Sequence, residues 1–186
     1  MFSSLAPIRA GSLWLLLAVL FQAQVGEGRV LITVDEALRS IYPDCVASKD
    51  TQYLSQAQIR EAQEASGLSV PSAVVIRYQV SCPGTALRYA YTDTHRVRTH
   101  PETLLVALDA QGKIARIEVL SFDEPTEYLP KTEWYDTFKS QSLTPELSLK
   151  RAIPTVTGAS LTSRATTEAA RRVLAVHQAL LKKPGQ

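Results

Sequence analysis

The sequence has little excess charge of either sign and no low-complexity tract. Its 186 residues carry 20 lysines and arginines against 18 aspartates and glutamates, a formal net charge of only +2. Basic and acidic residues are interleaved along the chain, so no polybasic face is present for nucleic acid, and we expect no nucleic-acid partner. With 45% hydrophobic and 20% charged residues, the chain can form a packed core, which excludes wholesale disorder.

Cysteine is also scarce. Cys45 and Cys82 stand far apart and outside any C-x-x-C or C-x-x-C-H arrangement, which excludes a zinc ribbon and a c-type haem attachment site. In an oxidising compartment the two can form one disulfide. Alternatively they are two small buried apolar groups, and their spacing does not decide between these readings. We assign them no catalytic role.

The apolar run Leu13–Phe21 is too short to cross about 30 Å of hydrocarbon. Arg9 precedes it, and the small residues Gly26 and Gly28 follow, which is the layout of a signal peptide over residues 1–28. An uncleaved N-terminal membrane anchor is the alternative. Both place the rest of the chain outside the cytoplasm, in the periplasm, either secreted across the inner membrane or anchored to it.

Two capping boxes mark helices in the first part of the chain. Thr33-Val-Asp-Glu36 opens an amphipathic segment that Pro43 ends. Ser55-Gln-Ala-Gln58 opens a more polar helix that runs to about Ser66 and stops at Gly67. Residues 29–85 therefore form a helical and first-strand region.

Two β-hairpins follow. β-Branched and aromatic residues at 74–80 and 87–91 flank Pro83-Gly84, and a clearer hairpin places the turn Asp109-Ala-Gln-Gly112 between strands at 103–108 and 113–120. In the last strand, alternation predicts that Ala115, Ile117 and Val119 share the buried face.

The last part of the chain reads as helical. Trp134 and Phe138 lie four apart, as on one face of a short helix. Apolar residues recur with helical spacing from Ala165 to Leu180. The fold class we predict is α+β, with a twisted, mainly antiparallel sheet, flanking helices and a long C-terminal helix, and with residues 86–183 forming the second region.

A loop rich in hydroxyl groups, Val156-Thr-Gly-Ala-Ser-Leu-Thr-Ser163, leads into that last helix. A helix N-terminus offers unpaired N–H groups and the positive end of the macrodipole, which suit phosphate, and Arg164 can add charge-assisted hydrogen bonds. Plain capping by serine and threonine is the competing interpretation. The loop lacks the second glycine of a nucleophile elbow and the G-K-[ST] ending of a P-loop, so neither a serine hydrolase nor a nucleotide hydrolase is indicated.

Thr157-Gly-Ala-Ser-Leu-Thr-Ser163 is similar to the S/T-G-A-T-x-T-S signature of FMN-binding domains in peripheral subunits of sodium-pumping NADH:quinone oxidoreductases and Rnf-type complexes. Upstream, residues 104–120 resemble that family's strand-turn-strand, and the loop Glu124-Pro-Thr-Glu-Tyr128 resembles its E-T-P-G loop without the glycine. The resemblance covers about half the chain, and its parts occur in the family's order. It implies that residues 86–183 form the FMN-binding domain.

The resemblance implies FMN as cofactor, attached through its phosphate to the residue at position four of the signature. Ser160 holds that position, where the family has threonine, and its hydroxyl can form the same ester. The cofactor-binding residues carried over are Ser160, Thr157, Gly158, Ala159, Leu161, Thr162, Glu124 and Thr126. Tyr128, Leu129 and Trp134 are candidates for the apolar and aromatic walls that a flavin ring needs.

The function so implied is an extracytoplasmic electron carrier rather than an enzyme, with no catalytic residues of its own. Its partners would be a flavin transferase for maturation and membrane-associated redox proteins as electron donor and acceptor. A flavin-free binding module, a reductase with its own small acceptor, and a structural subunit of a membrane redox complex are the alternatives. Asp93, His95 and His100 lack the spacing of a helical metal pair, so we expect no metal site.

Overall fold

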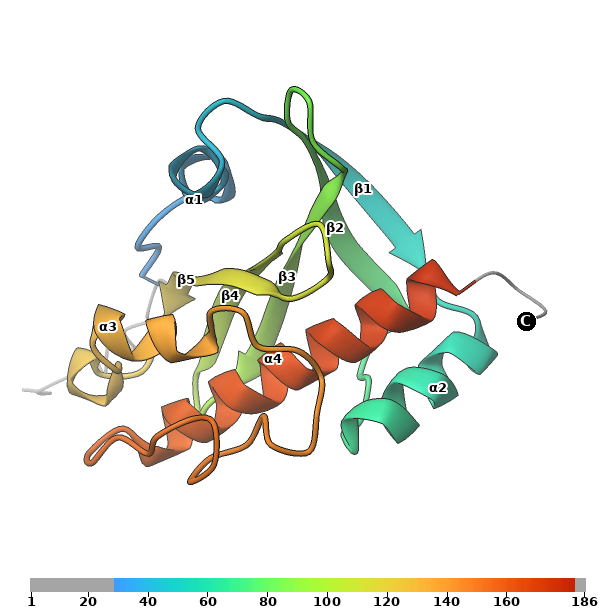
Figure 1. Cartoon of the computed structure of the whole chain (residues 1–186). Helices are drawn as coiled ribbons and strands as arrows, with labels where there is room; N and C mark the ends of the chain where they lie inside the picture. Colours follow the sequence, from blue (N-terminus) through green and yellow to red (C-terminus); the bar gives the residue numbers. More distant parts are fainter. Residues whose placement is uncertain (1–28, 183–186) are drawn as a thin grey trace, which may run out of the picture.

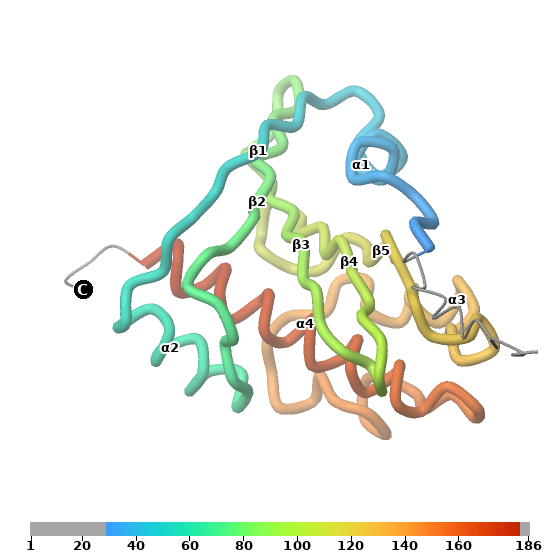
Figure 2. The backbone as a smooth tube through the Cα atoms, turned by 180° about the vertical axis from the view of Figure 1, so that it is seen from behind, coloured from blue at the N-terminus to red at the C-terminus, as the bar shows by residue number. Residues whose placement is uncertain are grey.

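The computed structural model describes residues 29–182, and its elements are shown in Figures 1 and 2. The helices are α1 (Val34–Ile41), α2 (Gln56–Ser66), α3 (Thr132–Tyr135) and α4 (Ser160–Leu181), with 3-10 turns η1 (Thr126–Tyr128) and η2 (Asp136–Phe138). The strands are β1 (Val46–Tyr53), β2 (Val74–Ser81), β3 (Arg88–Arg96), β4 (Pro101–Leu108) and β5 (Ile114–Phe122). The predicted leader, residues 1–28, lies outside the described residues.

The five strands form one antiparallel sheet in the order of the chain, β1-β2-β3-β4-β5, so the predicted α+β fold is confirmed. The long helix α4 runs across one face of the sheet, with α2 beside its C-terminal half (Figure 1). The predicted boundary at residue 85 falls in the hairpin that joins β2 to β3 within this sheet. None of the helices in residues 29–182 is both long and apolar enough to span a bilayer.

Both predicted capping boxes are present. In each, the side chain of Thr33 or Ser55 accepts the third helical N–H, and the residue three positions later accepts the N–H of the cap. Strand β1 was not predicted, because its sequence is polar and it lies at the edge of the sheet, mostly exposed. Its sequence lacks the regular alternation of apolar and polar residues that marks a half-buried strand.

The sheet is covered on both faces. On one face, side chains of β3, β4 and β5 pack against the buried stripe of α4, which comprises Ala169, Ala170, Val173 and Leu174. On the other face, α1 packs its Ala37 and Leu38 against residues of opposite parity in β2, β3 and β4. Strand β4 is therefore buried along most of its length. It contributes side chains to the core on both faces of the sheet.

The buried face of β5 differs from the prediction. Two register shifts interrupt its pairing with β4, one between Ala107 and Leu108 and one between Thr103 and Leu104. At the first, Ala115 is an extra residue in the ladder, so Ile114 joins Ile117 in the core beneath α4. Ile117 is buried and Val119 partly buried as expected, but Ala115 is not in the core, because a bulge reverses the alternation.

The Trp134–Phe138 segment is a shorter helix than its spacing suggested. One turn of α3 continues into the 3-10 turn η2, and both aromatic side chains are buried with ring centroids 5.2 Å apart. The indole Nε1 of Trp134 donates to the carbonyl of Pro154 at 2.8 Å. Trp134 thus packs in the core, and its hydrogen bond holds the backbone at Pro154, a few residues before α4 begins.

A buried polar cluster ties α4 to the sheet. Arg172 of α4 makes a bidentate ion pair with Asp93 of β3, with both N···O distances 2.8 Å. His95 lies between Asp93 and Glu102, 2.9 Å from the first carboxylate and 3.0 Å from the second. Thr166, six residues before Arg172 in α4, donates to Glu102. These contacts hold the middle of α4 in one rotational setting against β3 and β4.

His95 carries a positive charge in this cluster over a wide pH range. Burial by itself would lower the pKa of His95, but the hydrogen bonds to Asp93 and Glu102 outweigh it and raise the pKa to about 9. Since this value exceeds the unfolded value near 6.5, the charged imidazole stabilises the fold fully below about pH 6.5. That contribution is lost as the pH rises through about 9.

We therefore expect His95→Gln to lower the free energy of unfolding by about 2 kcal/mol at pH 6, because two buried carboxylates lose their shared cation. The deficit should shrink as the pH is raised past 9. Urea unfolding of both proteins from pH 6 to pH 10 measures it. The exposed His100 offers a matched control, His100→Gln, and a deficit in His95→Gln that does not vary with pH would contradict this account.

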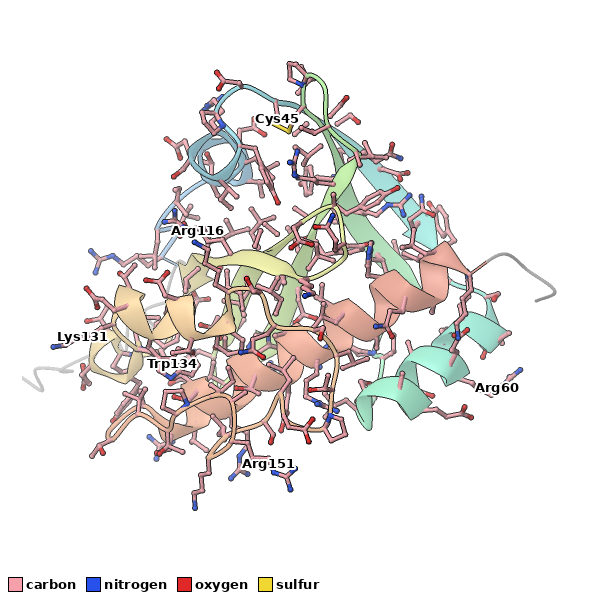
Figure 3. The ribbon with its side chains drawn as sticks, in the orientation of Figure 1. Cys45, Arg60, Arg116, Lys131, Trp134 and Arg151 are labelled. Carbon is pink, nitrogen blue, oxygen red and sulfur yellow. A yellow bond between two sulfur atoms is a disulfide. The ribbon has the colours of Figure 1, made fainter. Side chains whose placement is uncertain are left out.

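The two cysteines form a disulfide, which resolves the choice that sequence left open. Cys45 precedes β1 and Cys82 follows β2, and their Cα atoms are 4.3 Å apart (Cys45 is labelled in Figure 3). The bond closes a loop with a sequence separation of 37 and joins two strands that already pair as neighbours. It clamps the edge strand β1 at the end where its residues are most exposed.

Replacing both cysteines by serine should lower the free energy of unfolding by about 3–4 kcal/mol, the loop-closure cost for a ring of this size. Denaturant unfolding of the double variant, beside the wild type with and without reductant, checks the value. Reduced wild type should match the variant. Equal stability of oxidised wild type and variant would show that the clamp contributes nothing.

Candidate functional site

Helix α4 begins at Ser160, directly after the hydroxyl-rich loop. Gly158 has φ +85, a left-handed conformation that side-chain-bearing residues rarely adopt, and a Cβ at this position would contact nothing within 4 Å. Ala159 is the N-cap, and no side chain caps the helix. The turn at Gly158 therefore brings the chain into α4 with open space beside it.

The hydroxyl groups of this first turn point away from the capping positions. Ser160 Oγ donates to the carbonyl of Val156 at 3.3 Å, and Ser163 Oγ donates to that of Ala159 at 2.8 Å. Thr162 Oγ1 donates to the carbonyl of Tyr128 at 2.6 Å. Plain capping is thus the wrong interpretation of this loop, because all three hydroxyls act as donors to carbonyls.

Three N–H groups remain at the start of α4. The N–H of Ser163 reaches the carbonyl of Ala159, but those of Ser160, Leu161 and Thr162 have no protein acceptor within residues 29–182. Such groups, at the positive end of a 22-residue helix with no acidic residue in its first turn, suit an anion.

These groups face a pocket of about 290 Å³. Three segments that are distant in sequence line it: the β3–β4 turn, the segment after β5, and the start of α4. The lining residues are Val97, Arg98, Glu124, Tyr128, Gly158, Ala159, Ser160, Leu161 and Thr162. Ser160 is exposed at this pocket, and Leu161 is 47% exposed.

Six of the eight predicted site residues line this pocket, and Thr157 and Thr126 do not. Thr157 is exposed on the preceding loop, and Thr126 begins η1. Among the candidate ring walls, Tyr128 lines the pocket, whereas Leu129 and the core residue Trp134 do not. Arg164 is exposed outside the lining.

Val97 and Arg98 were missed by sequence reasoning. They belong to the turn between β3 and β4, which carries no motif, and only the pairing of these strands brings that turn to the start of α4. The guanidinium of Arg98 lies over the ring of Tyr128, 5.8 Å from its centroid.

Glu124 holds the β3–β4 turn in place through hydrogen bonds. Its Oε1 accepts hydrogen bonds from the backbone N–H of Thr99 at 2.6 Å and of His100 at 2.8 Å. Burial acts against the ionised form, but these hydrogen bonds outweigh it and hold the pKa of Glu124 below its usual range. The carboxylate is therefore charged at neutral pH and joins the segment after β5 to the β3–β4 turn.

Glu124→Gln should lower the free energy of unfolding at pH 7 by about 1–2 kcal/mol, because an amide oxygen is a weaker acceptor for these two N–H groups. A folded pKa below the unfolded one gives stability that is present above about pH 4.5 and lost as the pH falls. The two proteins should converge in acid, as measured by urea unfolding from pH 7 to pH 3. Glu127→Gln, an exposed glutamate in the same segment, serves as control; a constant gap would contradict the prediction.

Residues 99–175 match the family model of the FMN-binding domain. This match confirms the family resemblance read from the signature, and it supports FMN as the cofactor. The match runs from the β3–β4 turn into the second half of α4, so it contains the Glu124 segment and the start of α4. Searches of curated proteins and of solved structures find no match.

The residues of the pocket suit FMN. The free N–H groups at the start of α4 fit a phosphate, and Tyr128 with Val97 and Leu161 gives apolar and aromatic surface for part of the ring. When bound, FMN supplies the capacity to take up and release one or two electrons. The free N–H groups of α4 would then hold its phosphate, and the surrounding side chains would limit its access to water and set the charge around it.

Proposed function

We propose that this chain is an extracytoplasmic electron carrier whose FMN is esterified to Ser160. The observation that carries the proposal is the position of the Ser160 hydroxyl. It is exposed at the pocket, at the first residue of α4, beside N–H groups that suit the phosphate. Its hydrogen bond to the Val156 carbonyl is long, at 3.3 Å, so little is lost when the oxygen becomes an ester.

A flavin dinucleotide can donate the FMN group in a balanced reaction. Ser160 Oγ forms a bond to the phosphorus next to riboflavin, the bond from that phosphorus to the bridging oxygen breaks, and the nucleoside monophosphate leaves. The hydroxyl proton leaves with the products, so the chain gains the mass of FMN minus water. Free N–H groups at a helix start stabilise the charge on the phosphoryl oxygens. A separate flavin transferase would supply the base that accepts this proton.

An electron carrier outside the cytoplasm benefits from a tether, because lost FMN is not readily replaced there. The Cys45–Cys82 disulfide supports an oxidising compartment, where such bonds persist. The leader expected over residues 1–28 supports the same location. Donor and acceptor would be membrane-associated redox proteins that approach the pocket at the start of α4.

The central test is the mass of the mature protein after co-expression with a flavin transferase. Wild type should gain FMN minus water and fluoresce in a denaturing gel, whereas Ser160→Ala should do neither. Ser160→Thr, which restores the hydroxyl, should be modified. Thr155→Ala removes an exposed hydroxyl that lies directly before this loop and outside the pocket. It is the matched control and should be modified like wild type.

Unmodified wild type that still binds FMN would remove the tether and leave a dissociable flavoprotein. A wild type that is both unmodified and colourless would favour the alternative, a flavin-free binding or structural subunit of a membrane redox complex. Modification that persists in Ser160→Ala would place the ester on another residue.

A further inference from the structure

The pocket at the start of α4 contains one cation without an ionic partner. Arg98 lines it, and no carboxylate within residues 29–182 forms an ion pair with this guanidinium. Two arginines of α4 are engaged, since Arg172 pairs with Asp93 and Arg171 donates to backbone carbonyls. Arg164, near the start of α4, lies outside the pocket lining. Arg98 contacts the ring of Tyr128 instead, which holds its head group at the pocket.

The same pocket contains a carboxylate. Glu124 lines it, and the hydrogen bonds from Thr99 and His100 keep this group ionised. An anionic ligand placed beside Glu124 meets repulsion unless a cation offsets that charge. Arg98 belongs to the turn that Glu124 fastens, so the carboxylate and the guanidinium enter the pocket on adjoining pieces of backbone.

We propose that Arg98 is a ligand of the FMN phosphate, completing with the free N–H groups of α4 an anion site that the signature alone does not encode. Arg98 lies one residue before the segment that matches the family model. Its guanidinium offers several N–H donors in a fixed plane, which match two phosphoryl oxygens at once. The proposal rests on FMN binding and requires neither the ester at Ser160 nor electron transfer.

The test uses the Ser160→Ala protein, in which any FMN is untethered, and compares FMN with riboflavin, which lacks the phosphate. Flavin fluorescence titrations give both dissociation constants. Adding Arg98→Gln should weaken FMN about tenfold and leave riboflavin within twofold, because one charge-assisted contact to phosphate is lost. Arg98→Lys keeps the positive charge but lacks the planar set of N–H donors. In the same background, its FMN affinity should lie between that with Arg98 and that with Arg98→Gln.

Arg96→Gln is the matched control. Arg96 is the last residue of β3 and lies next to the same turn. It is exposed, donates to the carbonyl of Thr99 and does not line the pocket. Its replacement should leave the affinities for both flavins unchanged. If it weakens FMN as much as Arg98→Gln does, then the turn as a whole matters and Arg98 has no specific role. Equal weakening of FMN and riboflavin by Arg98→Gln would place Arg98 against the ring and overturn the proposal.

Inorganic phosphate gives a second readout that does not depend on flavin. At millimolar phosphate, the melting temperature of Ser160→Ala should rise, and Arg98→Gln should remove most of that rise while Arg96→Gln preserves it. A rise that survives Arg98→Gln would contradict the proposal. So would a Ser160→Ala protein that responds to neither phosphate nor FMN, since the site would then bind no free anion. Failure of covalent loading in wild type would affect only the proposed function.

Discussion

The structure depends on a long helix whose first turn is left without caps. Helix ends normally satisfy their free N–H groups with serine or threonine side chains, and this chain has such residues in abundance there. Their hydroxyls instead bind carbonyls of the loop and of Tyr128, so the N–H groups stay open to a ligand. An uncapped helix start costs about 1 kcal/mol of stability, which binding of an anion can offset.

The rest of the fold holds the first turn of α4 in place. The apolar stripe of α4 packs on the sheet, and the Arg172–Asp93–His95–Glu102 cluster fixes the helix in the middle of its length. Near its start, the Thr162 bond to Tyr128 and the Glu124 bonds to the β3–β4 turn bring the other two walls of the pocket to it. The site is thus assembled from three segments by contacts that lie mostly outside the signature.

This division explains what could be read from sequence. Capping boxes, a glycine stop and helical spacing are local, so α1, α2 and α4 and both predicted hairpins follow from the chain's own pattern. The edge strand β1 and the bulge at Ala115 depend on pairing partners, and no local pattern reveals them. Likewise Ser160 and Glu124 were found through a motif, whereas Arg98 reaches the pocket only because β3 and β4 pair. The role of Glu124 in holding the β3–β4 turn could not be read from a motif either. It depends on backbone N–H groups that lie 24 and 25 residues earlier in the chain.

The most direct measurement of the central claim is a crystal structure of the flavin-loaded protein. The account predicts the phosphorus bonded to Ser160 Oγ, its free oxygens within hydrogen-bonding distance of the N–H groups of Leu161 and Thr162, and no side-chain cap on α4. A flavin whose phosphate lies away from the start of α4, with those N–H groups bound to water, would contradict it.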